Sequence, residues 1–511
     1  MENELQKRIW TEPQIENEFL EHLCTMNNIY NIMALCISYI YNEYEYENNK
    51  FDFAEFDFDK YKEEKECINE YIKDREYLGE EDAIENLREN LIELLKGKLC
   101  IDICYALVRY FDKFIYPEKP KKYVNKNIYI EYSYLNTEFK DRIAILPYYS
   151  ETKCERSINK IVEEKRVFRK RRNPDASLFG KFLNQYIILD KEKIKQYPLK
   201  MYFLPKDSAI SQKLNRKGTL TIKIVPFTNK KLENVLDIKY NLNTFEINGI
   251  SENISSLLRK RHEQTYKKMK GEYNIDFLIF PEMLIDSEMN NDYIKIKNGD
   301  NAFFVFDGSK WGNRTNSSQI VYHDKKIQTK FDYHKKSCYN YKKNGREYIE
   351  RLDSSVKTDF LIWDIEDFGR ISICICCDLI EEQVKQFHML LKTNVLFVPS
   401  YSKSMDLLSG AEMLSKDYLC IVIMANACSA VADQIENNKD KKICFVTMPG
   451  KQGTKRSCKE FYIEKEHCWE NCENSECGYI ININLNKYVI DDNGICSFQI
   501  ENNKGGDYHE C

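Results

Sequence analysis

Short apolar runs in the second half of the chain predict β-strands, because each is roughly four to eight residues long and ends at polar or turn-forming residues. These runs are IDFLIF at 275–280, ISICICC at 371–377, NVLFVPS at 394–400 and IVIMAN at 421–426. After 371–377, Val384, Phe387 and Leu391 repeat at helical spacing, so the chain turns from a strand into an amphipathic helix. Strands that alternate with helices indicate the α/β fold class.

The turn after the strand 371–377 carries a group of thiols. By strand alternation, Cys374 and Cys376 lie on one face and Cys377 lies on the other. A helix N-terminus favours negative charge and therefore thiolate over thiol, so a cysteine there is a candidate covalent catalyst. The alternative is that all three thiols are buried packing, as most cysteines are.

A candidate acid or base, Glu282, follows the strand 275–280 directly after Pro281. A glutamate at the end of a buried strand lies at the rim of a sheet, where ligand sites form. The alternative is a solvated carboxylate at a strand end.

Taken in order, residues 216–490 resemble the nitrilase (carbon–nitrogen hydrolase) superfamily. GTLTIKIVPF resembles the family's first strand, SENISSLLRKRHEQTYKKM its first helix, NAFFVFDGSKWGNRTNSSQIVYHD its next strand pair, and GYIININLN its closing strand. The resemblance implies that Glu282 in FLIFPEM is the catalytic glutamate. It also implies that Cys376, in the Cys-x-Asp of GRISICICCDL, is the nucleophile. It further implies a four-layer α-β-β-α sandwich and homodimers or larger assemblies.

The family also places a catalytic lysine between the glutamate and the cysteine, often in a Tyr-x-Lys pattern. Tyr333-His334-Lys335 fits that pattern, so Lys335 is the first choice and Lys330 the runner-up. The remaining alternatives are Lys336, Lys342 and Lys343, and a second, supporting glutamate would be Glu350 or, failing that, Glu347.

These residue types predict a hydrolase of a non-peptide carbon–nitrogen bond, in an amide rather than a nitrile, with no cofactor. Glu282 would take the Cys376 proton, the lysine would stabilise the tetrahedral intermediate, and water would resolve a thioester. One alternative is a non-hydrolytic module that uses the same fold for ligand sensing or partner binding. Another makes the N-terminal half a nucleic-acid-binding platform within a larger bacterial system, with the hydrolase as its effector.

The first 215 residues resemble no family, and we divide the chain at PEKPKK into a helical region 1–120, a mixed, basic region 121–215 and a hydrolase-like domain 216–511. Residues 14–42 predict one helix, and 81–111 predict a long amphipathic one with Leu87, Leu91 and Leu94 along a stripe. Short strands are expected in 127–135 and 185–190. No Gly-rich phosphate loop occurs, which argues against an attached ATP-dependent synthetase.

Composition changes little in this interpretation. Hydrophobic residues make up 43% of the 511, and no run approaches the ~20 apolar residues that a membrane span needs. The N-terminus does not read as a signal peptide, so the 19 cysteines are expected to be reduced thiols in a bacterial cytoplasm. A net charge of −5 implies no overall attraction to nucleic acid.

Two local clusters remain. Six basic residues lie within 165–172, and Arg169–Arg172 would bind nucleic-acid phosphate or, in the interpretation that we favour, form a solvated helix face or a dock for an acidic protein. Near the C-terminus, Cys468, Cys472 and Cys477, with Cys458 or His467 as a fourth ligand, form a weak candidate for a structural zinc site. A chance cluster in a cysteine-rich chain is the alternative, and we predict no catalytic metal.

Overall fold

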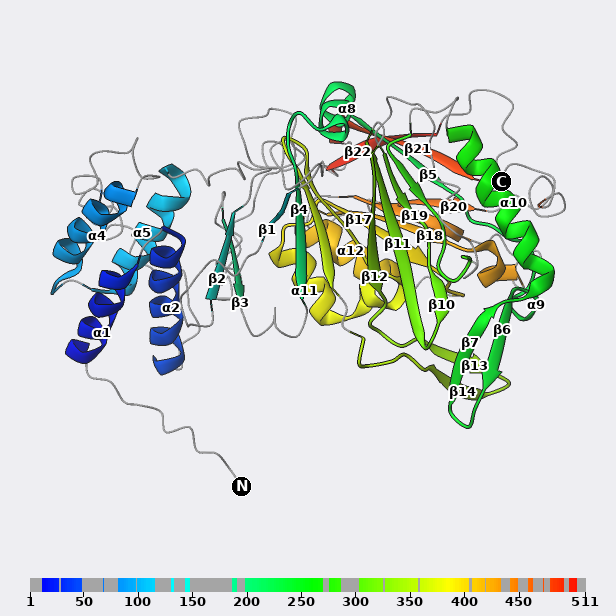
Figure 1. Cartoon of the computed structure of the whole chain (residues 1–511), viewed down its shortest axis with the longest axis horizontal. Coiled ribbons are helices and arrows are strands. Elements are labelled where there is room, and N and C mark those ends of the chain that lie inside the picture. The colour runs from blue at the N-terminus through cyan, green and yellow to red at the C-terminus, as the bar shows by residue number, and fades with distance from the viewer. Residues whose placement is uncertain are drawn as a thin grey trace. The chain divides into compact units, whose positions relative to one another are not determined.

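The computed structural model describes most of the second half of the chain and parts of the first (Figure 1). The described residues are 12–26, 29–47, 68, 81–97, 99–114, 130–132, 143–147, 186–190, 198–269, 275–285, 303–324, 327–356, 359–403, 407–418, 420–432, 442–448, 458–462, 472, 478–490 and 496–502. The chain divides into two compact units. The first comprises 1–121, 133–149 and 168–196, and the second comprises 122–132, 150–167 and 197–511.

The first unit is mainly helical, as expected. Its helices are α1 (Glu12–Thr25), α2 (Ile29–Glu47), α4 (Glu81–Leu95) and α5 (Ile101–Phe114), and its two-stranded sheet pairs β2 (Ile143–Pro147) with β3 (Tyr186–Asp190). Leu87, Leu91 and Leu94 are buried in a core to which these described helices all contribute, which confirms the predicted stripe. The prediction of one helix over 14–42 and one over 81–111 is wrong, because each range holds parts of two helices. Gly97, with φ of 71°, lies in the break between α4 and α5, where a left-handed conformation ends the helix.

The second unit contains two eight-stranded sheets. The first sheet has the order β1 (Ile130–Tyr132), β4 (Leu199–Leu204), β15 (Phe360–Ile365), β16 (Gly369–Ile373), β17 (Val395–Ser400), β18 (Ile421–Asn426), β19 (Lys442–Thr447) and β20 (Cys458–Tyr462). The second has the order β10 (Lys310–Gly312), β11 (Thr315–Asp324), β9 (Phe303–Phe306), β8 (Phe277–Ile279), β5 (Thr219–Ile224), β21 (Tyr479–Ile490) and β22 (Cys496–Asn502), with β12 (Ile327–His334) paired to β11.

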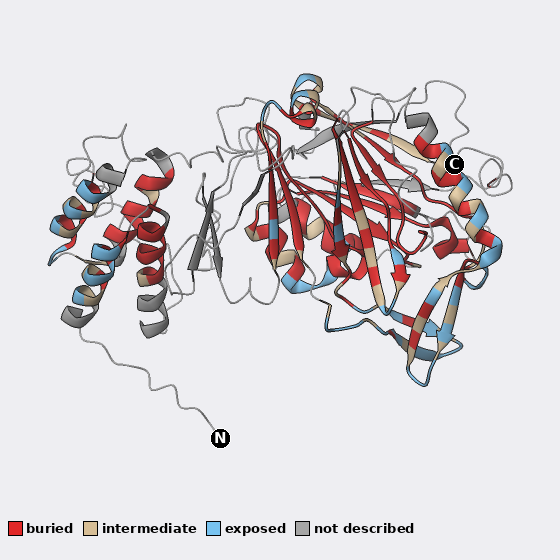
Figure 2. Ribbon diagram, viewed as in Figure 1, coloured by how far each residue is buried: buried red, intermediate tan, exposed pale blue. Residues whose placement is uncertain are grey.

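Aromatic side chains join the two sheets face to face. The ring centroid of Phe397 on β17 lies 4.3 Å from that of Phe306 on β9 and 4.8 Å from that of Phe277 on β8. Trp363 on β15 meets Phe304 edge-on at 5.5 Å. The strands of both sheets are largely buried (Figure 2), so the main core of this unit lies between them.

Helices complete the mixed α/β architecture that the sequence predicts. They are α8 (Ala209–Lys217), α9 (Leu232–Val235), α10 (Glu252–Met269), α11 (Glu382–Leu390) and α12 (Leu407–Tyr418). Helix α12 packs on β18 and β19 of the first sheet, and α10 contacts the end of β8 through His262 and Phe280. The complete four-layer order stays a prediction.

The hydrolase-like unit begins earlier than the predicted residue 216. Strand β4 pairs in parallel with β15 along its whole length, from Leu199 opposite Phe360 to Leu204 opposite Ile365. Helix α8 follows it, capped by the side chain of Ser208, which accepts a hydrogen bond from the Ser211 N–H. Part of the region 121–215 that we expected to be separate is therefore built into the first sheet.

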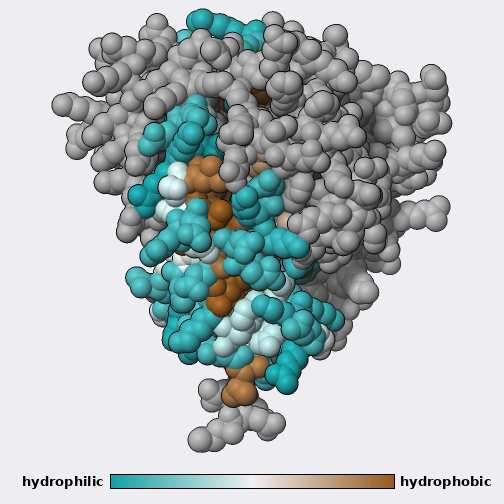
Figure 3. All heavy atoms as spheres, turned by 90° about the vertical axis from the view of Figure 1, so that its right-hand side faces the viewer, coloured by the Kyte–Doolittle hydropathy of each residue, from teal (hydrophilic) through white to brown (hydrophobic). Residues whose placement is uncertain are grey.

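A third, four-stranded sheet was not predicted. It has the order β13 (Asn340–Lys343), β14 (Arg346–Glu350), β7 (Thr244–Ile250) and β6 (Leu236–Tyr240). Leu242, in the turn between β6 and β7, is 95% exposed. Figure 3 shows the side of the molecule that carries α10 and the β6–β7 hairpin, where hydrophilic residues surround a narrow apolar strip. Among the residues that the structure describes, no helix is long and apolar enough to span a membrane.

Candidate active site

The Cys376 thiol lies at the end of β16, in a turn that differs from the one expected. Residues Cys376–Ile380 form a short 3-10 helix, and the α-helix α11 starts only at Glu382. Cys376 itself has φ of 47°, in the left-handed region that non-glycine residues rarely adopt. Such strain persists only where the surroundings hold the residue in place.

Asp378 supplies part of that support. Its Oδ1 accepts hydrogen bonds from the Ser337 N–H at 2.7 Å and the Lys336 N–H at 3.1 Å, and its Oδ2 accepts one from the Tyr333 hydroxyl at 2.9 Å. The carboxyl is fully buried, and burial raises its pKa. The third residue of the Cys-x-Asp pattern therefore ties the turn that carries Cys376 to the segment that carries Lys335.

The Lys335 ammonium lies between two carboxylates. Its Nζ is 2.7 Å from Glu282 Oε1 and 2.8 Å from Glu350 Oε2, and none of the three side chains is more than 1% exposed. The Lys335 N–H donates to the Asn316 carbonyl at 2.8 Å, which extends the pairing of β12 with β11 past His334.

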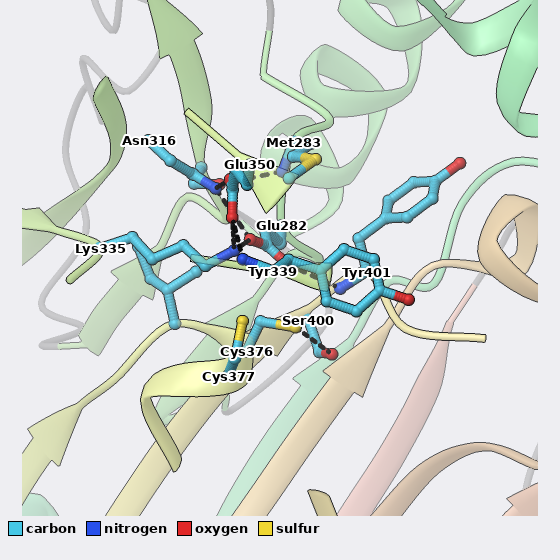
Figure 4. A network of polar contacts seen from close by, with 12 residues as sticks. Glu282, Met283, Asn316, Lys335, Tyr339, Glu350, Cys376, Cys377, Ser400 and Tyr401 are labelled. Atoms are coloured by element: carbon cyan, nitrogen blue, oxygen red, sulfur yellow. Dashed lines mark hydrogen bonds and ion pairs between the residues drawn. The ribbon is translucent and has the colours of Figure 1, made fainter. Parts of the chain in front are cut away.

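Further donors fix both carboxylates. Asn316 Nδ2 donates to Glu282 Oε1 at 2.8 Å, and the Tyr401 N–H donates to Glu282 Oε2 at 2.9 Å. The Tyr339 N–H donates to Glu350 Oε2 at 2.8 Å (Figure 4). Since Asn316, Tyr401 and Lys335 all donate to the Glu282 carboxylate oxygens, these contacts favour the ionised form of the carboxyl.

Cys376 joins this network through Ser400, the last residue of β17. The Ser400 hydroxyl donates to Cys376 Sγ at 3.4 Å, and the Ser400 carbonyl accepts the Glu282 N–H at 3.3 Å. The ends of β8, β16 and β17 thus meet across the two sheets and bring Glu282, Cys376 and Ser400 together. Figure 4 shows the Cys376 and Cys377 sulfurs on the same side of the cluster as the Lys335 ammonium.

The electrostatics of the cluster make Glu282 a stronger base than an exposed glutamate. Burial and the neighbouring Cys376 raise the pKa of Glu282 well above its usual value, although the Lys335 ammonium opposes the rise. Burial alone would lower the pKa of Lys335, but Cys377, Glu282 and Glu350 together raise it well above its usual value. The lysine therefore stays charged.

The thiol does not have the lowered pKa that the sequence analysis expected from a helix N-terminus. Its hydrogen bond with Cys377 and its burial raise the pKa of Cys376 well above the usual value, while Lys335 and Ser400 lower it. Cys376 at rest is thus a thiol, and it would need a base within the cluster to become a thiolate.

The other lysines and glutamates considered from the sequence lie elsewhere. Lys330 on β12 is exposed and pairs with Val321. Lys336 is half-buried with its N–H on Asp378, Lys342 pairs with Glu347 at 2.8 Å, and Lys343 lies over the Tyr240 ring. Of these candidates, the structure brings only Lys335 and Glu350 together with Glu282 and Cys376.

Sequence reasoning missed Asn316 and the two tyrosines that approach the site. Burial along β11 alternates from Asn316 through Ser318 to Ile320, so Asn316 shares the inward face of its strand. The alternation that places Asn316 on the inward face of the strand, level with Ser318 and Ile320, was the available signal. Tyr339 and Tyr401 contribute backbone N–H groups, for which a sequence offers no signal.

Two sequence candidates lie largely outside the described residues. These are the basic run 165–172 with Arg169–Arg172, and three of the five residues proposed for zinc, His467, Cys468 and Cys477. Among the described residues, no group of three or more His, Cys, Asp or Glu could hold a metal ion. Cys472 is described and buried, and its carbonyl accepts a hydrogen bond from Arg261.

The sequence matches no protein-family model and no curated protein. Among solved structures, Nit3 of Saccharomyces cerevisiae, a member of branch 10 of the nitrilase superfamily, is similar at 11% identity over 48% of this chain and 91% of its own, with a TM-score of 0.30. An amidase from Nesterenkonia sp. is similar at 12% identity over 48% of this chain and 90% of its own, with a TM-score of 0.25. A glutamine-dependent NAD+ synthetase from Acinetobacter baumannii is similar at 10% identity over 55% of this chain and 47% of its own, with a TM-score of 0.33. The solved structures that this chain resembles thus include members of the nitrilase superfamily, the family that its residues 216–490 resemble.

Proposed function

We propose that this chain is a cysteine-dependent hydrolase that cleaves a non-peptide carbon–nitrogen bond, in an amide rather than a nitrile, through a thioester. The observation that carries the proposal is the buried Lys335 ammonium, held at 2.7 Å and 2.8 Å by the carboxylates of Glu282 and Glu350 beside the Cys376 thiol. Taking such a group of charges out of water is costly, so its burial is weak evidence for a stabilising role and favours a functional one.

The first step is a proton transfer from Cys376 to Glu282. An amide is a poor electrophile, so the thiolate is needed for attack, and a nearby base with a raised pKa can accept the thiol proton at neutral pH. The new S–C bond converts the amide carbonyl into a tetrahedral intermediate with a negative oxygen.

Lys335 and the backbone N–H of Cys377 are the proposed stabilisers of that oxygen. A charged donor in a dry site acts strongly on developing charge because little water screens it. Glu350 and Asn316 position the lysine and Glu282 through their hydrogen bonds.

Collapse of the intermediate breaks the C–N bond, and the leaving amine takes the proton that Glu282 holds. This returns Glu282 to the carboxylate and leaves Cys376 as a thioester. Glu282 then takes a proton from water, whose oxygen attacks the thioester, and the proton returns to the Cys376 sulfur as the acid leaves. A single carboxylate thus serves as the base and the acid in both halves of the amide reaction.

The test is the release of ammonia or amine from a panel of small amides and nitriles by the purified full chain. We expect turnover of an amide that is lost in Cys376→Ala and retained in Cys338→Ala, which removes an exposed thiol outside the carboxylate–lysine cluster. No turnover across the panel, or equal turnover by Cys376→Ala, would contradict the proposal and favour the sensing or interaction module.

A further inference from the structure

A second thiol lies beside the proposed nucleophile, and the hydrolytic steps do not use it. Cys377 is 7% exposed and Cys376 is 2% exposed. Cys377 Sγ donates to the Ser337 carbonyl at 3.5 Å, and the two neighbouring thiols are hydrogen-bonded to each other. Figure 4 shows both sulfurs facing the same cluster, although they come from consecutive residues.

Both sulfurs are electrostatically coupled to the Lys335 ammonium. The ammonium opposes the burial that keeps Cys376 protonated, and the thiolate that forms when Glu282 takes the proton is the form that reacts with peroxides. The base that would activate Cys376 for amide attack, Glu282, would activate it equally for attack on another small electrophile.

We propose that Cys376 and Cys377 form a reversible oxidation site for hydroperoxides, with Cys377 as the resolving thiol. In the first step the Cys376 thiolate attacks the peroxide, an S–O bond forms, the O–O bond breaks, and the leaving hydroxide or alkoxide takes a proton. In the second step Cys377 Sγ attacks the Cys376 sulfenic acid. An S–S bond forms, the S–O bond breaks, and hydroxyl leaves with the Cys377 proton as water. The thiol pair loses two electrons and the peroxide gains them.

The product would be a labile disulfide. Consecutive Cα atoms are about 3.8 Å apart across a trans peptide, whereas disulfides usually join Cα atoms about 4.4–6.8 Å apart. The eight-membered ring is therefore strained, and strained disulfides are readily reduced. Such a bond would block the nucleophile under oxidation and release it when thiols return. The loss of activity rests on the proposed function, but the disulfide itself does not.

Two other thiols compete for the role of resolving group. Cys374 is buried on the same peptide segment and is coupled electrostatically to Cys376 and Cys420. Cys338 is exposed, one residue from the Ser337 carbonyl that Cys377 contacts. Cys374→Ser and Cys338→Ser are therefore the matched controls.

The experiment treats the full chain with hydrogen peroxide, blocks the remaining thiols, and maps the tryptic peptide 371–385 by mass spectrometry before and after dithiothreitol. We expect this peptide to lose the mass of two hydrogens, with the bond localised to Cys376 and Cys377, and dithiothreitol to reverse the change. The loss should persist in both control variants. It should vanish in Cys377→Ser and Cys377→Ala, where oxygen atoms should accumulate on Cys376 instead.

Three results would overturn the proposal. The first is oxygen added to Cys376 in the wild type with no loss of two hydrogens. The second is a disulfide that survives in both Cys377 variants, and the third is an unmodified peptide at peroxide levels that oxidise Cys338. A reversible disulfide in a protein that turns over no amide would support the oxidation site and contradict the proposed function alone. Where amide turnover is present, it should fall and recover in parallel with the mass change.

Discussion

Lys335 carries a buried positive charge that depends on several charged or polarisable neighbours. One buried ammonium balances the carboxylates of Glu282 and Glu350, and it is coupled to the sulfurs of Cys376 and Cys377. Removing one partner of a buried ion pair leaves an uncompensated charge, which costs more than the pair contributes. The same cation is the proposed stabiliser of the tetrahedral intermediate, so stability and activity should both depend on it.

We therefore expect Lys335→Met to lower the free energy of unfolding by about 3–5 kcal/mol. Amide turnover should fall by roughly 10²–10³ if the fold persists, the usual cost of losing an oxyanion stabiliser. Denaturant unfolding and steady-state kinetics measure the two effects. Lys330→Met is the matched control, since that lysine is exposed, and its unfolding free energy should change by less than about 0.5 kcal/mol. Equal effects of the two substitutions would contradict the role assigned to Lys335.

The sequence contains a pattern that distinguishes Lys335 from the neighbouring lysines, but that pattern was not used to choose among them. Burial recurs at every second position, at Phe331, Tyr333, Lys335 and Ser337. Lys330, just before this series, and Asp332, within it, are exposed. Period-two alternation from the two aromatic residues therefore puts Lys335 on the inward face. The segment contains so many lysines that residue type alone left five alternatives. Glu282 and Cys376 were easier to choose, because each directly follows an apolar strand.

At the scale of elements, the site depends on how closely two chain segments approach after β8 and β9. Gly308 has φ of 68°, and a Cβ added there would lie 1.9 Å from the Pro281 carbonyl oxygen, next to Glu282. The segment that carries Glu282 is also tied to this turn, because the Met283 N–H donates a hydrogen bond to the Ser309 hydroxyl oxygen at 2.9 Å. A side chain at 308 would push this segment away from the cluster.

Gly308→Ala should accordingly reduce amide turnover by roughly 10²-fold, the cost of displacing a catalytic group by about 1 Å. Gly345→Ala is the matched control: its φ is 76°, but no atom lies within 4 Å of the added Cβ. It should cost only the left-handed backbone penalty of about 1–2 kcal/mol in stability and leave turnover intact. Thermal unfolding and kinetics compare the two variants, and a Gly308→Ala variant as active as Gly345→Ala would contradict the described approach of these segments.

The strands were the elements that the sequence predicted best. Runs such as Val395–Ser400 and Ile421–Asn426 are buried throughout, and a short run that is buried on both faces is typical of a strand in a parallel sheet. The helix interruption at Gly97 was missed because apolar spacing continues on both sides of it. The four-stranded sheet of β6, β7, β13 and β14 was missed because its strands have mixed exposure, and β14 pairs with a strand a hundred residues earlier. Only tertiary packing decides such a pairing.

For the molecule as a whole, the buried carboxyl of Asp307 links stability to pH. Burial raises the pKa of Asp307 from 3.8 to about 6, although the hydrogen bond from the Tyr266 hydroxyl opposes the rise. Between these two values the folded chain binds more protons than the unfolded chain, so stability is highest below the lower value and falls as the pH rises through the upper one.

The free energy of unfolding of the wild type should therefore fall by roughly 3 kcal/mol, relative to Asp307→Asn, between about pH 4 and pH 7. Asparagine keeps an acceptor for Tyr266 but cannot ionise. Urea unfolding of both proteins across this range isolates the contribution, because all other titrating groups are shared. If the difference in unfolding free energy between the two proteins stayed constant, Asp307 would not titrate within this pH range.

The division into two units was only partly visible in the sequence. The apolar stripe of Leu87, Leu91 and Leu94 indicates a separate helical core, and the structure contains one. The position of β4 in the first sheet was not foreseen, because its parallel partner β15 lies more than 150 residues later and the pairing depends on distant packing. The residues of the candidate site all lie in the second unit.

The most direct test of the central claim is the mass of the full chain after incubation with a small panel of amides, followed by a thiol-directed probe and peptide mapping. The account predicts an acyl adduct on Cys376, which protects that residue from the probe and is absent in Cys376→Ala. If no adduct forms, and Cys376 reacts with the probe no differently from the other cysteines, the buried cluster of Glu282, Lys335 and Glu350 does not activate a nucleophile and the hydrolase assignment fails.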